Sequence, residues 1–472
     1  MWWLSFSVSA AVTALLGWSL WGLVSLYGFK SRLPRGSSTN KQGDKKASRL
    51  KIAFIHPDLG IGGAERLVVD AALGLQSAGH SVVIFTAHHD PSHCFVETIN
   101  GTLEVRVYGD WLPRSFLGRF HTLFALLRNF WVAHQLVKQH HKDASSSQGG
   151  YDIIFSDSIS ASIPLFKRAT NAKVVFYCHF PDQLLTQRKS FLKKLYRWPI
   201  DWVEEITTGM ADIVLVNSIF TQQTFLNTFQ RLAQRDDPPT VVYPSINFQQ
   251  YDMQEEGSDD ENKNKANEEE AEELMFLSVN RYERKKNIGL AIEAFAKLKE
   301  LRPKLYPRLR LVIAGGYDPR NNENKEHFEE LVATAKQLNV PSDQISFLRS
   351  ISAKERNRLL HKCLAVIYTP ENEHFGIVPV EAMYAKRPVI ACNSGGPTES
   401  IKDGETGFLC SPNAASFAEK MALLVDSGIT HARETFGEAA RAHVLRKFSL
   451  ARFTEQLEDC MGTTTAKKKR ED

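Results

Sequence analysis

Two glutamates stand eight positions apart in the stretch ENEHFGIVPVEAM, residues 371–383. The run LAVIYTP before it predicts a buried strand, so Glu373 would lie on the loop beyond the strand's carboxyl end. A proline after the glycine is typical of a first helical turn, and we expect Glu381 to lie in that turn. A carboxylate there can accept hydrogen bonds from both hydroxyls of a ribose, while Glu373 can meet a transferred sugar. Two solvated glutamates near the positive end of a helix are the alternative for this segment alone.

Backbone N–H groups near these glutamates could bind phosphate. Gly376 and Ile377 bring such groups to the start of the helix that carries Glu381. The segment NSGGPTES, residues 393–400, supplies a further glycine pair and places Glu399 beside the same predicted edge. Together these residues indicate a nucleotide-binding surface.

A second glycine-rich turn, DLGIGGAE, follows the first apolar run of the chain. Gly60, Gly62 and Glu65 occupy the three positions of a G-x-G-x-x-G pattern, so the dinucleotide fingerprint is broken. Gly62 and Gly63 still place bare N–H groups at a predicted helix start, which suits a phosphate. Alone, this turn is weak support for a phosphate site.

Two basic side chains and a histidine follow other predicted strands. Arg281 and Lys286 lie in VNRYERKKN, at the carboxyl end of the run LMFLSVN. Fixed cations there can neutralise a diphosphate, arginine through a bidentate fork and lysine as a point charge. His179 ends the run KVVFYCH and could hydrogen-bond a sugar hydroxyl. A solvated basic turn and a core histidine are the alternatives for these segments taken singly.

Short apolar runs alternate with helical patterns along most of the chain. This alternation predicts the α/β class, with parallel sheets covered on both faces. It occurs in two halves, each large enough for its own sheet, and so predicts two Rossmann-like domains facing across a cleft. Ligands of such sheets bind outside the carboxyl ends of the strands, where every candidate residue falls.

The composition predicts the domain boundaries and narrows the function. The chain has 472 residues and a net charge of +4, with no nucleic-acid-binding motif, so we expect no nucleic-acid partner. Six scattered cysteines without a Cys-x-x-Cys pair indicate free thiols in a reducing compartment, and no metal or cofactor site is predicted. The expected segments are a transmembrane anchor 1–29, a basic linker 30–49, an N-terminal Rossmann-like domain 50–245, an acidic disordered insertion 246–273, a C-terminal Rossmann-like nucleotide-sugar domain with its terminal helix 274–462 and a basic tail 463–472. That the domain 50–245 is the acceptor-side domain is what a family resemblance of the chain implies.

The first 29 residues contain no charged side chain. As a helix, this segment would be long enough to cross a bilayer core of about 30 Å. A cleaved signal peptide is the alternative, but it usually has a basic start and a shorter apolar core. Basic residues follow the segment and none precedes it, so the positive-inside rule places the rest of the chain in the cytosol. Aromatic and basic residues are also interleaved at 113–131 and 188–202, as in core helices or in helices that contact an anionic membrane surface.

From about Lys51 to the C-terminal helix, the sequence resembles the retaining GT-B glycosyltransferases that carry the E-x7-E motif. The likeness rests on the order of Gly62 with Gly63, His179, Arg281 with Lys286, and Glu373 with Glu381. Within that group, segments such as YCHFPDQLLT, VNRYERKKN and NEHFGIVPVEAM are similar to the α-1,3/1,6-mannosyltransferases of lipid-linked oligosaccharide synthesis.

This resemblance implies a reaction, its partners and a location. Such enzymes take mannose from GDP-mannose and extend Man-GlcNAc2-diphosphate-dolichol, adding an α-1,3 and then an α-1,6 mannose with retention. GDP-mannose is a substrate, so no cofactor is expected. The implied location is the endoplasmic reticulum membrane, with the catalytic domains on its cytosolic face, and a complex with other enzymes of the pathway is possible.

The resemblance also implies roles for the candidate residues: Gly63 at the donor phosphates, Arg281 and Lys286 at the leaving diphosphate, Glu381 at the ribose, and His179 and Glu373 at the mannose. One departure is Asn287, where the broader family usually has glycine, and this puts the local turn in doubt.

Three alternative functions would each agree with some of these sequence features. A UDP-dependent N-acetylglucosaminyltransferase or another lipid acceptor would keep the fold. An inactive membrane scaffold would keep the anchor but not need the site residues. A NAD-dependent dehydrogenase would need the fingerprint that Glu65 breaks.

Overall fold

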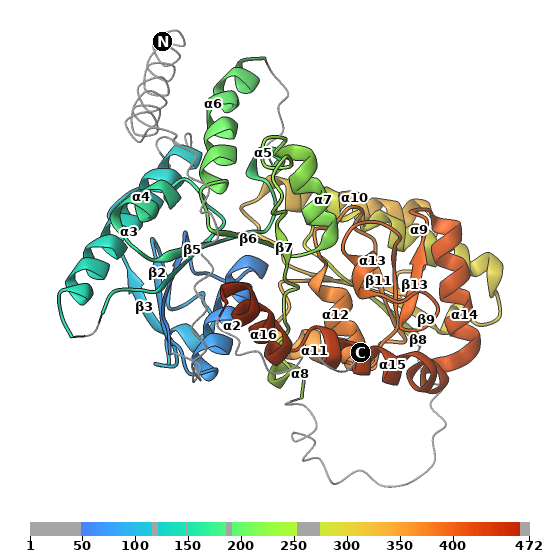
Figure 1. Cartoon of the computed structure of the whole chain (residues 1–472). Helices are drawn as coiled ribbons and strands as arrows, with labels where there is room; N and C mark the ends of the chain where they lie inside the picture. Colours follow the sequence, from blue (N-terminus) through green and yellow to red (C-terminus); the bar gives the residue numbers. More distant parts are fainter. Residues whose placement is uncertain (1–48, 116–120, 148, 186–190, 253–273, 463–472) are drawn as a thin grey trace. The chain divides into compact units, whose positions relative to one another are not determined.

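The computed structural model of the chain describes residues 49–115, 121–147, 149–185, 191–252 and 274–462 (Figure 1). The expected anchor 1–29 and tail 463–472 lie outside these ranges, as do nearly all of the linker and most of the acidic insertion. Within the described ranges, no helix has both the length and the apolar run that a membrane crossing needs.

The described chain forms two compact units. The first contains the residues up to Asn217, Gln222–Val242 and the residues from Thr454 onward, and the second contains Ser218–Thr221 and Tyr243–Phe453. We expected the whole terminal helix in the second domain, but its residues from Thr454 onward group with the first unit. One contact that holds them there joins His80 to Glu458, 3.1 Å apart.

The first unit is built on a seven-stranded sheet in the order β3-β2-β1-β4-β5-β6-β7, with every pairing parallel. Its strands are β1 (Lys51–His56), β2 (Ser81–Thr86), β3 (Glu104–Val107), β4 (Ile153–Asp157), β5 (Lys173–Cys178), β6 (Ile213–Val216) and β7 (Thr240–Val241). The helices between them are α2 (Gly63–Ser77), α3 (His121–Ala144), α4 (Ile163–Ala169), α5 (Asp182–Leu185), α6 (Phe191–Thr208) and α7 (Ile219–Thr228). The central strands read as unbroken apolar runs because helices cover both faces of a parallel sheet.

The second unit has a six-stranded parallel sheet in the order β10-β9-β8-β11-β12-β13. Its strands are β8 (Leu274–Val279), β9 (Leu309–Gly315), β10 (Ile345–Arg349), β11 (Ala365–Tyr368), β12 (Val389–Cys392) and β13 (Gly407–Cys410). Its main helices are α9 (Gly289–Leu301), α10 (Asn322–Gln337), α11 (Ala353–Lys362), α12 (Ile377–Tyr384), α13 (Pro397–Ser400), α14 (Ala414–Ala432) and α15 (Glu438–Lys447), and the terminal helix is α16 (Leu450–Met461).

Two apolar cores lie on the opposite faces of the second sheet. Successive residues of β8 show the alternation, since Phe276 belongs to one core and Leu277 to the other. The first core is completed by α9 and α14, which lie side by side in Figure 1, and the second by α12 and α15. The sheet is therefore held rigidly on both faces, and its strand ends can position side chains precisely enough for chemistry.

The start of the expected disordered insertion is folded, which corrects the boundary at residue 246. Residues 249–252 form the short helix α8 (Gln249–Asp252) in the second unit. Ile246 and Tyr251 are buried, and the Ile246 N–H donates to the carbonyl of Phe448. We did not predict these buried apolar residues, because composition describes the average of a segment whereas burial depends on single side chains.

Strand order fixes where each sheet can bind a ligand. In the first sheet the chain runs outward from β1 to β3 and then returns to β4 on the other side of β1. In the second it runs outward from β8 to β10 and returns to β11 beside β8. Loops leaving two such neighbouring strands turn in opposite directions, and the crevice at their carboxyl ends is the usual binding site.

Candidate active site

The switch point of the second sheet carries an ion pair between two predicted site residues. Lys286 follows β8 and Glu373 follows β11, and the Lys286 Nζ lies 2.5 Å from the Glu373 Oε2. The lysine is buried, and its carbonyl accepts a hydrogen bond from the Thr369 hydroxyl at 2.8 Å. A cation held this firmly at a strand end is suited to a diphosphate.

The turn that carries Lys286 accommodates Asn287 at the position where the broader family usually has glycine. Asn287 has φ 49° and ψ 39°, the left-handed conformation that asparagine adopts more readily than most residues. Its side-chain amide also donates to Glu371 at 3.4 Å. The turn that Asn287 had put in doubt is therefore formed.

Arg281 is not joined to Lys286 by any contact among the described residues. Its side chain is 61% exposed and its guanidinium pairs with Glu283 at 3.0 Å. The aliphatic part passes close to Gly316, where an added Cβ would lie 3.3 Å from the Arg281 Cγ. Arg281 thus leaves the carboxyl end of β8 as expected, with its charged end in solvent.

Glu381 lies one turn further along α12 than predicted. The helix begins at Ile377, so Pro379 lies in its first turn as expected, whereas Glu381 is the fifth residue and belongs to the second turn. The side chain is buried, and one carboxylate oxygen lies 3.2 Å from the Arg356 Nη1. The other oxygen, Oε2, is buried and has no hydrogen-bond partner within the described part of the chain. An unsatisfied buried acceptor costs about 1–3 kcal/mol, which is the state expected of a residue that awaits a ligand hydroxyl.

The loop between Glu373 and α12 is held by close backbone contacts. Gly376 has φ 83° and lies against the Tyr368 ring, where a Cβ would come within 3.2 Å. Gly395 and Gly396 pack on the same loop, and the Gly396 N–H donates to the Glu373 carbonyl at 2.8 Å. The glycine pair in NSGGPTES therefore supports the loop that carries Glu373.

A substitution at Gly395 tests this packing. Gly395 has φ 67°, and a Cβ there would lie 2.4 Å from the Glu373 carbonyl oxygen. We expect Gly395→Ala to lower the free energy of unfolding by about 2 kcal/mol or more, because backbone strain and overlap add. Gly404→Ala is the matched control, since Gly404 has φ 74° but no described atom within 4 Å of the added Cβ. Equal losses of thermal stability in the two variants would show that the contact with Glu373 is not needed.

Glu399 has a different environment from the one expected of a donor-binding residue. Its carboxylate accepts the backbone N–H groups of Ile219 and Phe220, both at 2.8 Å, and the Tyr243 hydroxyl at 3.0 Å. Ile219 and Phe220 belong to the second unit like Glu399, so the carboxylate caps the start of α7 within that unit, where negative charge is favoured. These three hydrogen bonds account for the carboxylate without a nucleotide.

The switch point of the first sheet carries a chain of three titratable side chains. His56 ends β1, Asp157 ends β4, and His179 follows β5. The two carboxylate oxygens of Asp157 each contact one imidazole: His56 Nδ1 at 2.7 Å and His179 Nε2 at 2.7 Å. His56 and Asp157 are buried, whereas the His179 side chain is 21% exposed. Of the two histidines, only the predicted one reaches the surface.

Burial and charge act against each other in this cluster. Burial disfavours the imidazolium of His56, but hydrogen bonds and charge from Asp157 and Glu65 outweigh it and raise the pKa of His56 to about 9. Burial also disfavours the charged form of Asp157, which would raise its pKa. The charge and hydrogen bonds of His179 and His56 nevertheless hold the pKa of Asp157 well below its usual range. The cluster therefore contains a carboxylate that stays ionised at neutral pH.

The glycine turn before α2 is shaped by Glu65. Gly62 caps the helix and Gly63 is its first residue, as predicted. A Cβ at Gly62 would lie 2.2 Å from a Glu65 carboxylate oxygen, whereas one at Gly63 would meet no described atom within 4 Å. Gly63 is thus open to a ligand, and Gly62 leaves room for Glu65, whose other oxygen is 4.0 Å from the His56 Nε2.

The pKa of His56 predicts a pH dependence of stability. A folded-state pKa of about 9, above the ordinary 6.5, stabilises the fold fully below pH 6.5, and this contribution is lost as pH rises through 9. The contribution is roughly 3 kcal/mol, and denaturant unfolding of the wild type should show it as a fall between these values. His56→Gln should flatten that fall, and an unchanged slope in the variant would contradict the assignment.

Three residues of the candidate site were not predicted from the sequence: His56, Asp157 and Arg356. His56 and Asp157 end the apolar runs KIAFIH and IIFSD, so the rule that found His179 would also have found them. The sequence shows that both residues end apolar runs, but it does not show the strand order that makes β1 and β4 neighbours. Arg356 lies in α11, away from any strand end, and no local pattern marks it.

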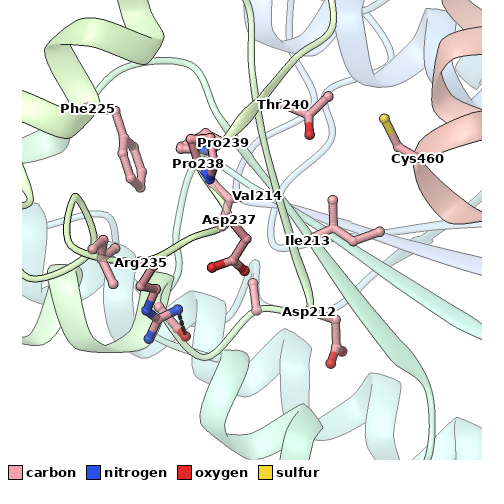
Figure 2. A pocket seen from close by; sticks show the side chains of 13 residues that line it. Asp212, Ile213, Val214, Phe225, Arg235, Asp237, Pro238, Pro239, Thr240 and Cys460 are labelled. Atoms are coloured by element: carbon pink, nitrogen blue, oxygen red, sulfur yellow. Dashed lines mark hydrogen bonds between the residues drawn. The ribbon is translucent and has the colours of Figure 1, made fainter. Parts of the chain in front are cut away.

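One cavity of about 230 Å³ lies elsewhere in the first unit. Figure 2 shows it beside the start of β6, lined by Asp212, Arg235, Asp237 and Cys460 among others. Residues that precede β6 lie at the amino edge of the sheet, opposite to the edge that carries His179. The cavity is therefore separate from the candidate active site. Across the described ranges, no cluster of three His, Cys, Asp or Glu side chains is arranged to hold a metal ion.

Comparison with known proteins first shows the class of enzyme to which the chain belongs. A family model described as "Glycosyltransferase Family 4" matches residues 61–250, and one described as "Glycosyl transferases group 1" matches residues 259–443. Among solved structures, sucrose-phosphate synthase from Thermosynechococcus elongatus aligns with a TM-score of 0.65 at 20% identity, covering 88% of this chain and 98% of that one. Anabaena Alr3699/HepE in complex with UDP and glucose aligns with a TM-score of 0.63 at 18% identity, covering 88% and 100%. At these identities the likeness shows the fold, which is the GT-B fold of two Rossmann-like units.

Curated relatives narrow the class further. The α-1,3/1,6-mannosyltransferase ALG2 of Rhizomucor pusillus is 47% identical over 432 residues, 87% of this chain and 91% of its own length. The human protein of the same name is 48% identical over 425 residues, 88% of this chain and 97% of its own. The chain belongs to this family of α-1,3/1,6-mannosyltransferases, and it is a glycosyltransferase. The predicted family, the two Rossmann-like units of the GT-B fold and the enzyme class are confirmed, whereas the predicted transmembrane helix falls on residues 1–29, outside the described ranges.

Proposed function

We propose that the protein transfers mannose from GDP-mannose to Man-GlcNAc2-diphosphate-dolichol, forming an α-1,3 and then an α-1,6 linkage with retention. The observation that carries the proposal is the Lys286–Glu373 pair at the switch point of the second sheet. A nucleotide-sugar transferase needs fixed positive charge at the leaving diphosphate and a polar contact to the sugar, and this pair offers both. The family supplies the identity of the sugar.

The reaction breaks the bond between the anomeric carbon of mannose and the diphosphate oxygen, and the bonding electrons leave with GDP. Lys286 is held in place to stabilise that charge, and Arg281 can add a bidentate contact when its exposed guanidinium turns from Glu283 to the donor. N–H groups at Gly376 and Ile377, at the start of α12, favour the same anion. These groups can stabilise the leaving group without a metal ion or a cofactor.

Glu373 and His179 are proposed to contact the mannose, and Glu381 the ribose. The buried, unpartnered Oε2 of Glu381 can accept a ribose hydroxyl, while Arg356 holds the other oxygen. Retention follows if the acceptor hydroxyl attacks from the face that the diphosphate leaves, with a donor phosphate oxygen taking its proton. In that scheme Glu373 need not be a nucleophile.

The proposed location is the cytosolic face of the endoplasmic reticulum membrane, with residues 1–29 as the anchor. The uncharged sequence of that segment and the basic residues after it support this orientation. In the first unit, Trp198 and Phe191 of α6 are 71% and 78% exposed, which suits contact with a lipid surface. A lipid-linked acceptor would then be presented to an enzyme already held at the bilayer, where other enzymes of the pathway could join it.

Donor binding tests the choice of nucleotide. We expect purified full-length protein to bind GDP and GDP-mannose more tightly than UDP or UDP-N-acetylglucosamine in calorimetric titrations. Glu381→Ala should weaken GDP binding by roughly 10- to 100-fold, because a hydrogen bond to a charged acceptor contributes about 1.5–3 kcal/mol. Glu329→Ala, at an exposed position of α10, is the control. Tighter binding of UDP would instead favour a UDP-dependent transferase on the same fold.

A further inference from the structure

Asp157 is a buried carboxylate for which the proposed chemistry has no direct use. Its side chain is 1% exposed, and both oxygens are engaged. Oδ1 contacts the His179 Nε2, and Oδ2 contacts the His56 Nδ1 and accepts a hydrogen bond from the Ser158 hydroxyl at 2.8 Å. Ser158 itself has φ 64°, so the backbone takes up strain next to the carboxylate.

The contacts of Asp157 determine how the His179 ring is presented. An ionised carboxylate only accepts hydrogen bonds, so the imidazole nitrogen that faces it must carry a proton. That nitrogen is His179 Nε2, which leaves Nδ1 as the ring atom available to a ligand. The backbone is fixed as well, since the Asn217 amide donates to the His179 carbonyl at 3.1 Å. The Tyr177 ring, 5.0 Å from the imidazole, packs against it.

We propose that Asp157 is a positioning residue for mannosyl transfer: it holds His179 with Nε2–H directed inward, so that Nδ1 is the atom that meets a hydroxyl of the transferred sugar. His56 holds Asp157 from the opposite side, because its Nδ1 occupies the second carboxylate oxygen. This inference rests on the proposed function, in which His179 contacts the mannose. It adds the ring atom that does so and the two buried residues that select it.

The charges around Asp157 support a fixed arrangement. Five titratable groups of the described chain interact with it: His56 from β1, Glu65 from α2, Tyr177 and Cys178 from β5, and His179 after β5. Glu65 lies on the far side of His56, so two carboxylates flank one imidazole. A buried array of this kind is stable only when each charge is paired, and removing one member leaves its neighbour unpaired.

Two substitutions at position 179 distinguish the roles of the two ring nitrogens of His179. The amide of asparagine lies near the position of Nδ1, and that of glutamine near Nε2. We expect His179→Asn to retain at least 10-fold more transfer activity than His179→Gln, measured as kcat with GDP-mannose and a synthetic lipid-linked acceptor. The reverse order would overturn the proposal.

A double-mutant cycle tests whether Asp157 acts through His179. Asp157→Asn should lower kcat by about 10- to 100-fold, as does loss of the partner that orients a functional histidine. In the His179→Ala background it should cost little more, because both changes remove the same interaction. Asp212→Asn is the control, a carboxylate at the opposite edge of the sheet that accepts from the Val174 N–H. Fully additive losses, or a loss explained by a lower unfolding midpoint of Asp157→Asn, would mean that Asp157 is only structural.

A spectroscopic readout keeps this inference separate from the reaction. Nitrogen-15 chemical shifts of the His179 ring, assigned with His179→Asn, report which nitrogen is protonated. The proposal requires protonated Nε2 in the wild type, and a neutral ring protonated only at Nδ1 would overturn it. If the wild type transferred no mannose at all, the proposed function would fail, while the ring shifts would still decide the role of Asp157.

Discussion

Replacing Lys286 with alanine is expected to lower kcat/KM for mannose transfer by about 100- to 1000-fold, the loss seen when one preorganised donor to a developing anion is removed. Lys286 is the buried cation at the switch point of the second sheet, 2.5 Å from Glu373. Its removal takes away charge at the leaving diphosphate and also leaves the Glu373 carboxylate without its partner. Both effects act on the same step, and the measurement is steady-state transfer from labelled GDP-mannose.

Lys285→Ala is the matched control for this prediction. Lys285 is the neighbouring residue, but its side chain is 65% exposed and pairs with Glu283 at 3.2 Å. Its loss should change kcat/KM less than about threefold, because exposed ion pairs contribute little. If Lys285→Ala and Lys286→Ala lost activity equally, the effect would come from the basic turn as a whole and not from the buried lysine.

Replacing Glu373 with alanine is expected to abolish both linkages together, with at least a roughly 100-fold loss for each, the equivalent of about 3 kcal/mol of a charged hydrogen bond to the sugar. The physical reason is that the chain presents one Lys286–Glu373 pair for two transfers. We therefore expect one site to serve both additions, with the acceptor shifted between them. The products of the variant should be resolved by linkage.

The affinity for GDP separates this variant from the one at Lys286. Removing Glu373 deletes a negative charge beside the lysine, so GDP binding should be unchanged or tighter, whereas Lys286→Ala should weaken it. Glu371→Ala, an exposed neighbour, is the control for the loop. A variant at Glu373 that lost only one linkage would contradict a single shared site.

The fold could be predicted well from the sequence because apolar runs of parallel strands are local signals. Runs such as KIAFIH and LMFLSV become β1 and β8 with helices after them. Lys286 and Glu373 could be predicted for the same reason, since each lies on the loop that follows such a run. Their 2.5 Å contact depends on β8 and β11 being neighbours, which the strand order alone decides.

Two differences between the expected and the observed surroundings of the site residues have definite physical causes. Glu381 was expected in the first turn of the helix, but the left-handed Gly376 lets α12 begin at Ile377, and this places Glu381 in the second turn. Glu399 was placed at the nucleotide because it follows a glycine pair, whereas α7 begins next to it and takes its carboxylate as a cap. In both cases the local pattern indicated a carboxylate, and the tertiary structure determined its partner.

The most direct test of the proposed function is a transfer assay with the purified full-length protein in liposomes, labelled GDP-mannose and a Man-GlcNAc2-diphosphate-lipid acceptor. We expect the wild type to add two mannoses, one α-1,3 and one α-1,6, and Lys286→Ala to add each of them at least about 100-fold more slowly. The chain would then be the enzyme, and the pair at the second switch point its active centre. Two mannoses added by Lys286→Ala at the wild-type rate, or transfer only from a UDP-linked sugar, would contradict it.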